Sequence, residues 1–202
     1  MTRNLYIGYS VFGALAATMW GIAPVVASER RLGWLALKRV SPMPLYAYFA
    51  AKTISGAAFV LIIHLLLTVL AVFVSRTPIT LSQWLLFTLS FLAAVPVFAA
   101  LGFLLGCLVS PDSASGLINL IAMPMAILSG LWLPLEVMPE AVRSVAPFLP
   151  AYHASQISRT ILGMQEVDML PLHVSMLAVM TAIAIGAAAW VWRRGGDADN
   201  HA

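Results

Sequence analysis

Charged residues are scarce in this chain. They make up 9% of its 202 residues, whereas 61% of the residues are hydrophobic. Soluble domains carry about 25% charged residues, so a soluble fold of this size would lack the polar surface to cover itself. The composition therefore predicts a chain that has the lipid bilayer as its solvent.

The sequence lacks the residues that several kinds of chemistry require. The single cysteine, Cys107, excludes an intrachain disulfide and a cysteine metal cluster. No G-x-x-x-x-G-K-[ST] phosphate loop, H-E-x-x-H or G-x-S-x-G motif occurs. His153 and His173 do not share a helical ligand spacing, so no metal is assigned to them. We expect no catalytic residue, no metal and no cofactor in this chain, and any ATP hydrolysis to come from another polypeptide.

Acidic residues are absent from the long apolar runs. An ion-coupled secondary transporter or channel would be expected to carry several acids within the membrane, so their absence argues against that class. A membrane enzyme would need a clustered catalytic set, and none is visible. A non-transporting assembly protein stays open as an alternative.

Five apolar runs are each long enough to cross a bilayer, which takes about 20 helical residues. They lie at about 5–27, 46–74, 81–109, 116–133 and 172–192. The expected fold is all-α: one polytopic membrane domain over residues 1–202, with five spans and short re-entrant or interfacial helices before the last span.

Basic residues cluster after the first and the last span. Seven of the eleven belong to these two places: Arg30, Arg31, Lys38, Arg39, Lys52, Arg193 and Arg194. The positive-inside tendency puts both places in the cytoplasm and the N-terminus outside. An outside N-terminus is unusual without a signal sequence.

Residues 28–44 form the first informative connection. Pro42 and Pro44 end any helix that begins earlier in it. Leu32, Leu35 and Trp34 share one helical side, and the basic residues lie largely elsewhere. This pattern is typical of a short amphipathic helix that lies on anionic lipid, or of one that enters a groove on a soluble partner. Both interpretations stay open.

The segment 129–153 contains four prolines between two apolar runs. Its pattern predicts a short helix with Pro139 in its first turn and a second helix at about 151–162, ended by Gly163. Residues 134–170 are expected to dip into the outer part of the membrane and return, which requires cover from protein or water. The alternative is an outer loop that rests on the headgroups.

A few polar or flexible residues lie within the predicted spans. His64, Asn119 and Met123 are candidates for a pathway. The plainer interpretations are a neutral imidazole bonded to a neighbouring helix for His64, a hydrogen bond between helices for Asn119 and adaptable packing for Met123. Gly102 and Gly106 form a G-x-x-x-G pattern, which permits close helix contact.

Two stretches resemble the type 2 permeases of ATP-binding cassette (ABC) transporters, and the resemblance covers about residue 5 to the end. The first is the "ER…G…L" loop that leads through "SPMP" to a lysine in the next span. The second is a "SG…P…MP…P" segment before the last span, carried by Ser129, Gly130, Pro134, Met138, Pro139 and Pro150.

The resemblance implies a permease subunit of an exporter in a bacterial inner membrane. It would form the translocation pathway with a second copy or a sister permease, surrounded by lipid, and would bind no nucleic acid. A separate ABC ATPase, which binds the ATP, would dock on residues 28–44. The implied docking residues are Glu29, Arg30, Arg31, Gly33, Trp34, Leu35, Leu37 and Lys38, with the cations steering and Gly33 and the apolar residues packing.

The chain departs from the family pattern at its start. The family has six spans, and the first span and the interfacial helix before it are not seen here. One upstream span would return the N-terminus to the cytoplasm. Truncation, a start at an internal methionine and a short variant all stay open, and the sequence does not reveal the substrate.

Overall fold

The computed structural model describes residues 3–40, 44–74, 76 and 78–199, of which 36, 39, 40 and 195–199 are described by backbone alone. Within these ranges the chain is helical and contains no β-strand, which confirms the all-α prediction. Five helices are long and apolar enough to cross a membrane. They are α1 (Arg3–Arg31), α3 (Leu45–Val69, extended by a π-helical turn at Leu70–Val74), α4 (Leu81–Leu108), α5 (Pro111–Leu128) and α8 (Leu170–Asp199).

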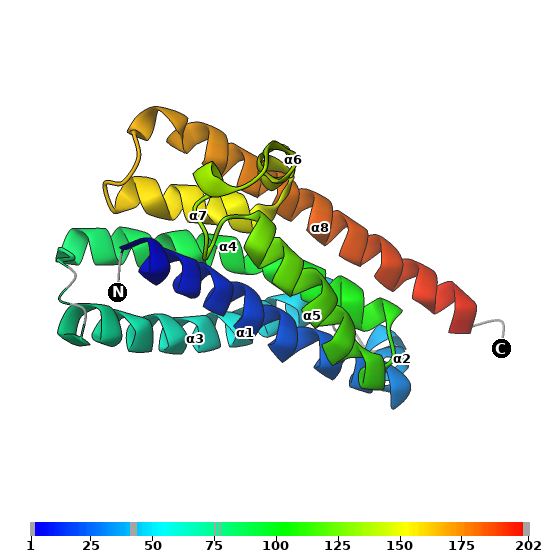
Figure 1. Ribbon diagram of the computed structural model, residues 1–202. Helices are drawn as coiled ribbons and strands as arrows, with labels where there is room; N and C mark the ends of the chain where they lie inside the picture. Colours follow the sequence, from blue (N-terminus) through cyan, green and yellow to red (C-terminus); the bar gives the residue numbers. More distant parts are fainter. Residues whose placement is uncertain (1–2, 41–43, 75, 77, 200–202) are drawn as a thin grey trace.

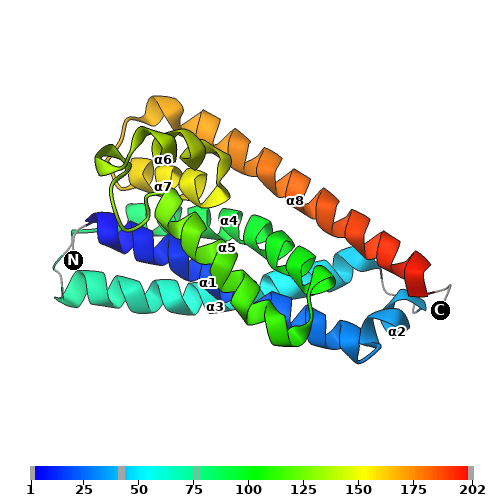
Figure 2. The same cartoon turned by 45° about the vertical axis from the view of Figure 1, so that its right-hand side comes forward.

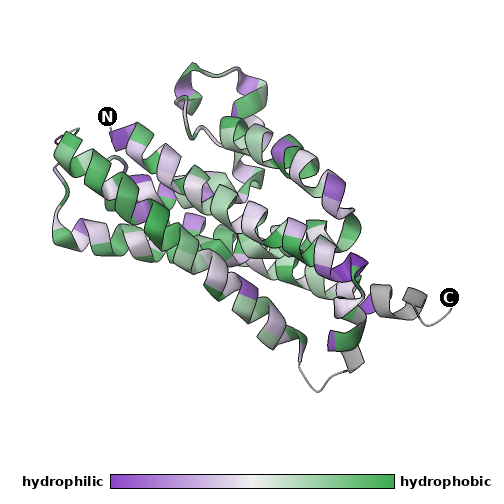
Figure 3. Ribbon diagram, turned by 90° about the horizontal axis from the view of Figure 1, so that it is seen from below, coloured by the Kyte–Doolittle hydropathy of each residue, from purple (hydrophilic) through white to green (hydrophobic). Residues whose placement is uncertain are grey.

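The five helices form one elongated bundle whose two ends differ (Figure 1). The short helix α2 (Trp34–Val40), the α4–α5 connection and the end of α8 lie at one end. The start of α1 lies at the other end, with the α3–α4 connection and the short helices α6 (Glu140–Val145) and α7 (Pro150–Ile161). We call these the basic end and the far end. Hydrophobic residues, coloured green in Figure 3, make up much of the long helices.

Helix α1 is the centre of the bundle. It packs against α3, α4, α5 and α7, and buries bulky side chains such as Tyr6, Leu15 and Met19. The predicted G-x-x-x-G contact is formed inside the chain, where α4 meets α1. A Cβ atom added at Gly106 would lie 2.7 Å from the carbonyl oxygen of Ala23, so only glycine permits this approach.

The helix boundaries follow capping signals as well as hydropathy. Helix α5 begins at Pro111, five residues before the predicted span, because Ser110 caps it and Asp112 lies in its first turn. It ends at Leu128 instead of residue 133. Gly130 has a φ of +69°, a left-handed conformation that stops the helix before Trp132. At the start of α4, Thr80 and Gln83 form a reciprocal capping box.

The segment before the last span contains the two short helices that the prolines predicted. Pro139 precedes α6, Pro150 is the first residue of α7, and Gly163 follows its end. Helix α7 packs against α1, α4 and α8, and nine of its twelve residues are buried, Gln156 and Thr160 among them. Protein therefore covers this non-spanning helix, as a segment at membrane depth requires.

Candidate functional site

Residues 28–44, which we call the elbow, contain a sharp turn that the sequence pattern did not place. Helix α1 runs unbroken to Arg31, so Glu29 and Arg30 belong to its last turn and not to the short helix. Gly33 then takes a φ of +74°, and α2 begins at Trp34. Pro44 precedes α3, whereas Pro42 lies outside the described residues. The glycine lets α2 turn away from α1.

Glu29 joins three helices at the inner side of the elbow. Its carboxylate accepts from the Nζ of Lys38 on α2 at 2.6 Å and from the Nζ of Lys52 on α3 at 2.9 Å. The Tyr48 hydroxyl donates to the same carboxylate, and the Lys38 ammonium lies 4.2 Å from the centre of the Tyr48 ring. These four side chains, the Glu29 hub, are largely shielded from water, which makes charge-assisted bonds stronger than on an open surface.

Two arginines tie the end of α1 to the α4–α5 connection. The Arg30 guanidinium donates to the carbonyl oxygens of Cys107 and, at 2.7 Å, of Val109. A cation suits this position because the carbonyls at the end of α4 carry the negative end of the helix dipole. Arg31 pairs with Asp112 at 3.1 Å, but both side chains are mostly exposed, so this pair adds little stability.

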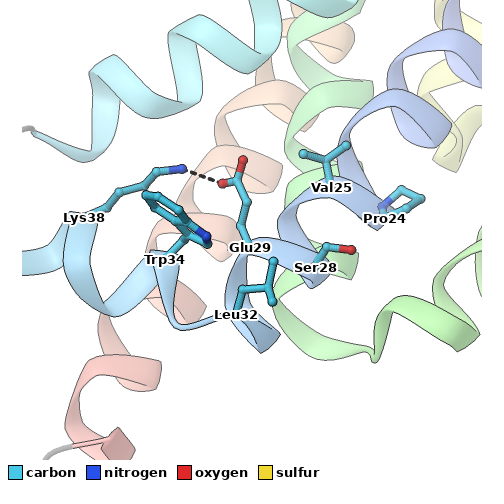
Figure 4. A pocket seen from close by; sticks show the side chains of 7 residues that line it. All are labelled: Pro24, Val25, Ser28, Glu29, Leu32, Trp34 and Lys38. Atoms are coloured by element: carbon cyan, nitrogen blue, oxygen red, sulfur yellow. Dashed lines mark hydrogen bonds and ion pairs between the residues drawn. The ribbon is translucent and has the colours of Figure 1, made fainter.

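The outer side of the elbow is apolar and open. Leu32, Trp34 and Leu37 have exposed fractions of 69%, 55% and 61%. Leu32 and Trp34 border a depression of about 580 Å³, in which Figure 4 shows Trp34 beside Lys38 and Glu29. Its other lining residues are Pro24, Val25 and Ser28 of α1, so the depression has both apolar and charged walls. Exposed apolar side chains this close together are typical of a contact surface.

The structure divides the predicted docking residues into two groups. Leu35 is buried with Tyr48 and Phe103, so its side chain holds α2 against the bundle and is closed to a partner. Glu29, Arg30 and Lys38 are likewise engaged within the chain. Arg30 nevertheless stays exposed, as do Arg31, Gly33, Trp34 and Leu37, together with Leu32, which the predicted docking set did not contain.

The far end is closed by contacts between distant parts of the chain. Arg159 of α7 donates to the Asn4 side chain at 2.7 Å and to the Gly130 carbonyl at 3.3 Å. A Cβ atom added at Gly8 would lie 1.7 Å from the carbonyl oxygen of Leu131. Gly8 therefore lets α1 and Leu131, which directly follows the Ser129–Gly130 part of the predicted motif, touch backbone to backbone. Pro134, Met138 and Pro139 delimit the turn Leu135–Val137 that follows.

His153 and His173 meet at the same end. Their Nδ1 atoms lie 3.0 Å apart, and the Nε2 of His153 lies 2.8 Å from the Pro147 carbonyl oxygen. A carbonyl only accepts, so a neutral His153 carries its proton on Nε2 and accepts from His173 at Nδ1. The pair links α7 to α8, which sequence spacing did not reveal because the residues lie on different helices. No group of three metal-ligating residues forms in the part of the chain that is described.

The structure separates the pathway candidates. His64 is buried among the rings of Tyr6, Trp84 and Phe91, and neither of its nitrogens has a hydrogen-bond partner among the residues that the structure describes. The expected bond to a neighbouring helix is therefore wrong, and the ring is enclosed in the bundle. Asn119 and Met123 lie one turn apart on the exposed side of α5, away from His64.

Comparison with known proteins decides which family this arrangement represents. A sequence profile described as "ABC-2 family transporter protein" matches residues 2–190, nearly the whole chain. The chain belongs to the ABC-2 transporter family. The resemblance predicted from the elbow and the Ser129–Pro150 segment is thereby confirmed, and the ABC-2 chain is a multi-pass membrane protein.

A similar protein of known sequence supports the same family. The chain is 30% identical over 148 residues, or 71% of its length, to the protein named "Putative transport permease YvfS" of Bacillus subtilis (strain 168). The match covers 59% of that protein, so the ABC-2 chain spans about three fifths of the relative's length.

Proposed function

We propose that this chain is the permease subunit of an ABC exporter, driven by a separate ATPase that docks on the elbow. The observation that carries the proposal is the exposed apolar set Leu32, Trp34 and Leu37 at the basic end. An apolar patch of this kind, held on a short helix, suits insertion into a groove on a soluble partner.

A force applied to α2 moves the spanning helices only if α2 is firmly attached to them. The Glu29 hub supplies this attachment, because it bonds the end of α1 to both α2 and α3. Leu35 adds an apolar contact on the inner side of α2. A push on α2 would therefore reach α1, which contacts α3, α4, α5 and α7, as a displacement of packed helices.

The complete transporter would contain two permease chains, either two copies or one copy with a sister permease, and the basic end would face the cytoplasm. Asn119 and Met123 on the exposed side of α5 are candidates to line a pathway between the two chains. His64 is buried within the bundle, which argues against a place for it on that route.

The docking role is tested with Trp34→Ala/Leu37→Ala. The matched control is Val137→Ala/Phe148→Ala, which removes two apolar side chains that are exposed at the far end. In membranes that contain the permease and its ATPase, we expect the elbow variant to lose ATP-driven efflux and the co-purified ATPase activity. Insertion and thermal stability should stay unchanged. Normal efflux in the elbow variant, or equal loss in both variants, would overturn the docking role.

A further inference from the structure

A second groove lies at the basic end, away from the elbow's outer side. It runs between the start of α3 and the end of α8, which lie at the same end of the bundle in Figure 2. Its volume is about 300 Å³, within the range of ligand sites. We call it the α3–α8 groove, and it is lined by Leu45, Tyr46, Phe49, Phe103, Ile185, Ala188, Ala189 and Arg193.

The groove is apolar along its length and basic at one end. None of its eight lining residues is acidic, and Arg193 is the one cation among them. Arg193 is exposed, and it has no ion-pair partner among the side chains that the structure describes. Its neighbour Arg194 lies over the Trp190 ring, 4.0 Å from the ring centre. The groove therefore offers hydrocarbon contact beside an exposed guanidinium near the end of α8.

The dimensions match one lipid chain in one leaflet. From Ile185 to Arg193 the α8 helix rises about 12 Å, and each leaflet of a hydrocarbon core about 30 Å thick contributes about 15 Å. The length of the groove and the cation at its end therefore suit a lipid with an anionic headgroup.

A neighbouring hollow extends the same side of α8. It has a volume of about 440 Å³, lies between α8, α4 and α7, and shares Ile185 with the groove. Two hollows joined along one helix suit an elongated ligand better than a compact one.

We propose that the α3–α8 groove binds an anionic phospholipid of the leaflet at the basic end. One acyl chain lies along Phe49, Phe103 and Ala189, and the phosphate pairs with Arg193. Guanidinium groups bind phosphate through two parallel hydrogen bonds, and anionic lipids are concentrated in the cytoplasmic leaflet. The exposed Tyr46 lies at the headgroup level, where aromatic residues are favoured.

The test compares phosphatidylglycerol with phosphatidylcholine of the same acyl chains, added to the purified, delipidated permease. Bound lipid is counted by native mass spectrometry, and thermal stability is measured in parallel. We expect the wild-type chain to prefer phosphatidylglycerol about fivefold, since one basic residue near an anionic surface contributes about a factor of five. Arg193→Gln should abolish this preference. Arg194→Gln should retain the preference for phosphatidylglycerol, because the wild-type Arg194 side chain lies on the Trp190 ring.

Ala189→Trp separates chain binding from headgroup binding, because the indole fills the groove and should abolish retention of both lipids. Three outcomes would overturn the proposal: equal retention of both lipids by the wild-type chain, equal effects of the two arginine variants, or a change of Ala189→Trp from dimer to monomer with lipid binding intact. The last would mean that a second copy covers the groove. No ATPase enters this test, so its result is independent of the proposed function.

Discussion

The elbow and the far-end segment use prolines in the same way but present opposite surfaces. Both interrupt a run of apolar spans with a short helix delimited by proline or glycine. In the elbow, Leu32, Trp34 and Leu37 point outward and α2 is held by the charges of the Glu29 hub. At the far end, α7 is buried between α1, α4 and α8. The elbow therefore presents an exposed apolar surface to a partner, whereas α7 is buried and closes the far end of the bundle.

The difference lies in what holds each helix. Helix α2 is seven residues long, and Leu35 is its buried anchor. The ion pair of Lys38 with Glu29 of α1 and the contact of Lys38 with the Tyr48 ring of α3 add to its attachment. Helix α7 has nine buried residues and is fastened by contacts in which a backbone atom takes part, such as Arg159 with Gly130. Loss of a contact at the far end should therefore affect stability, whereas changes on the open side of the elbow should affect coupling.

The largest effect is expected from Gly8→Ala. The added methyl group would meet the Leu131 carbonyl oxygen at 1.7 Å, and this oxygen belongs to backbone that cannot turn aside. Overpacking of this kind costs about 3 kcal/mol or more, or about 10 °C in melting temperature for a chain of this length. Thermal unfolding of the purified protein in detergent measures the change.

Gly21→Ala in the same helix is the matched control, because nothing lies within 4 Å of the added Cβ atom. We expect it to be neutral or to gain up to about 1 kcal/mol, since alanine favours helix more than glycine does. If both variants melt alike, the close approach of α1 and Leu131 is not needed for the fold, and the contrast between the two regions fails.

A smaller loss is expected from Glu29→Gln. The substitution leaves Lys38 and Lys52 without their carboxylate, and hydrogen bonds to charged groups contribute about 2 kcal/mol. Asp112→Asn breaks the exposed pair with Arg31 and should cost less than about 0.5 kcal/mol. Denaturation curves of the two variants check the ratio. Equal losses would mean that the Glu29 hub is no more shielded than an ordinary surface pair.

The sequence predicted the parts of the fold that depend on local patterns. Apolar runs gave the five spans, and prolines and glycine gave the two short helices of the far end. Hydropathy alone predicts too late a start for α5, whereas Ser110, Pro111 and Asp112 carry the signal for the observed helix start. The break at Gly33 was missed because a glycine between two helical stretches is tolerated in many continuous helices.

Contacts between distant residues were beyond prediction from one sequence. Nothing in the spacing of Glu29, Tyr48 and Lys52 shows that α1 and α3 bring them together. The same holds for the side of α2 that faces the bundle. Leu35 and Leu37 are alike in hydropathy, yet the first is 2% exposed and the second 61%. The packing of α2 on Tyr48 and Phe103 decides between them.

An effect smaller than that of Glu29→Gln is expected from acid at the far end. Burial lowers the pKa of His153 below its ordinary value, so the unfolded chain takes up this proton at a higher pH than the folded chain does. Stability should therefore be constant at higher pH and fall as the pH drops through about 6.5, by at most about 1.4 kcal/mol at pH 5.5. A proton on the Nδ1 of His153 would also remove its acceptor for His173. Melting temperatures between pH 7.5 and pH 5.5 should fall more steeply for the wild-type chain than for His153→Gln. Parallel curves would show that this imidazole pair does not respond to pH, and that the far end is held by packing and backbone contacts alone.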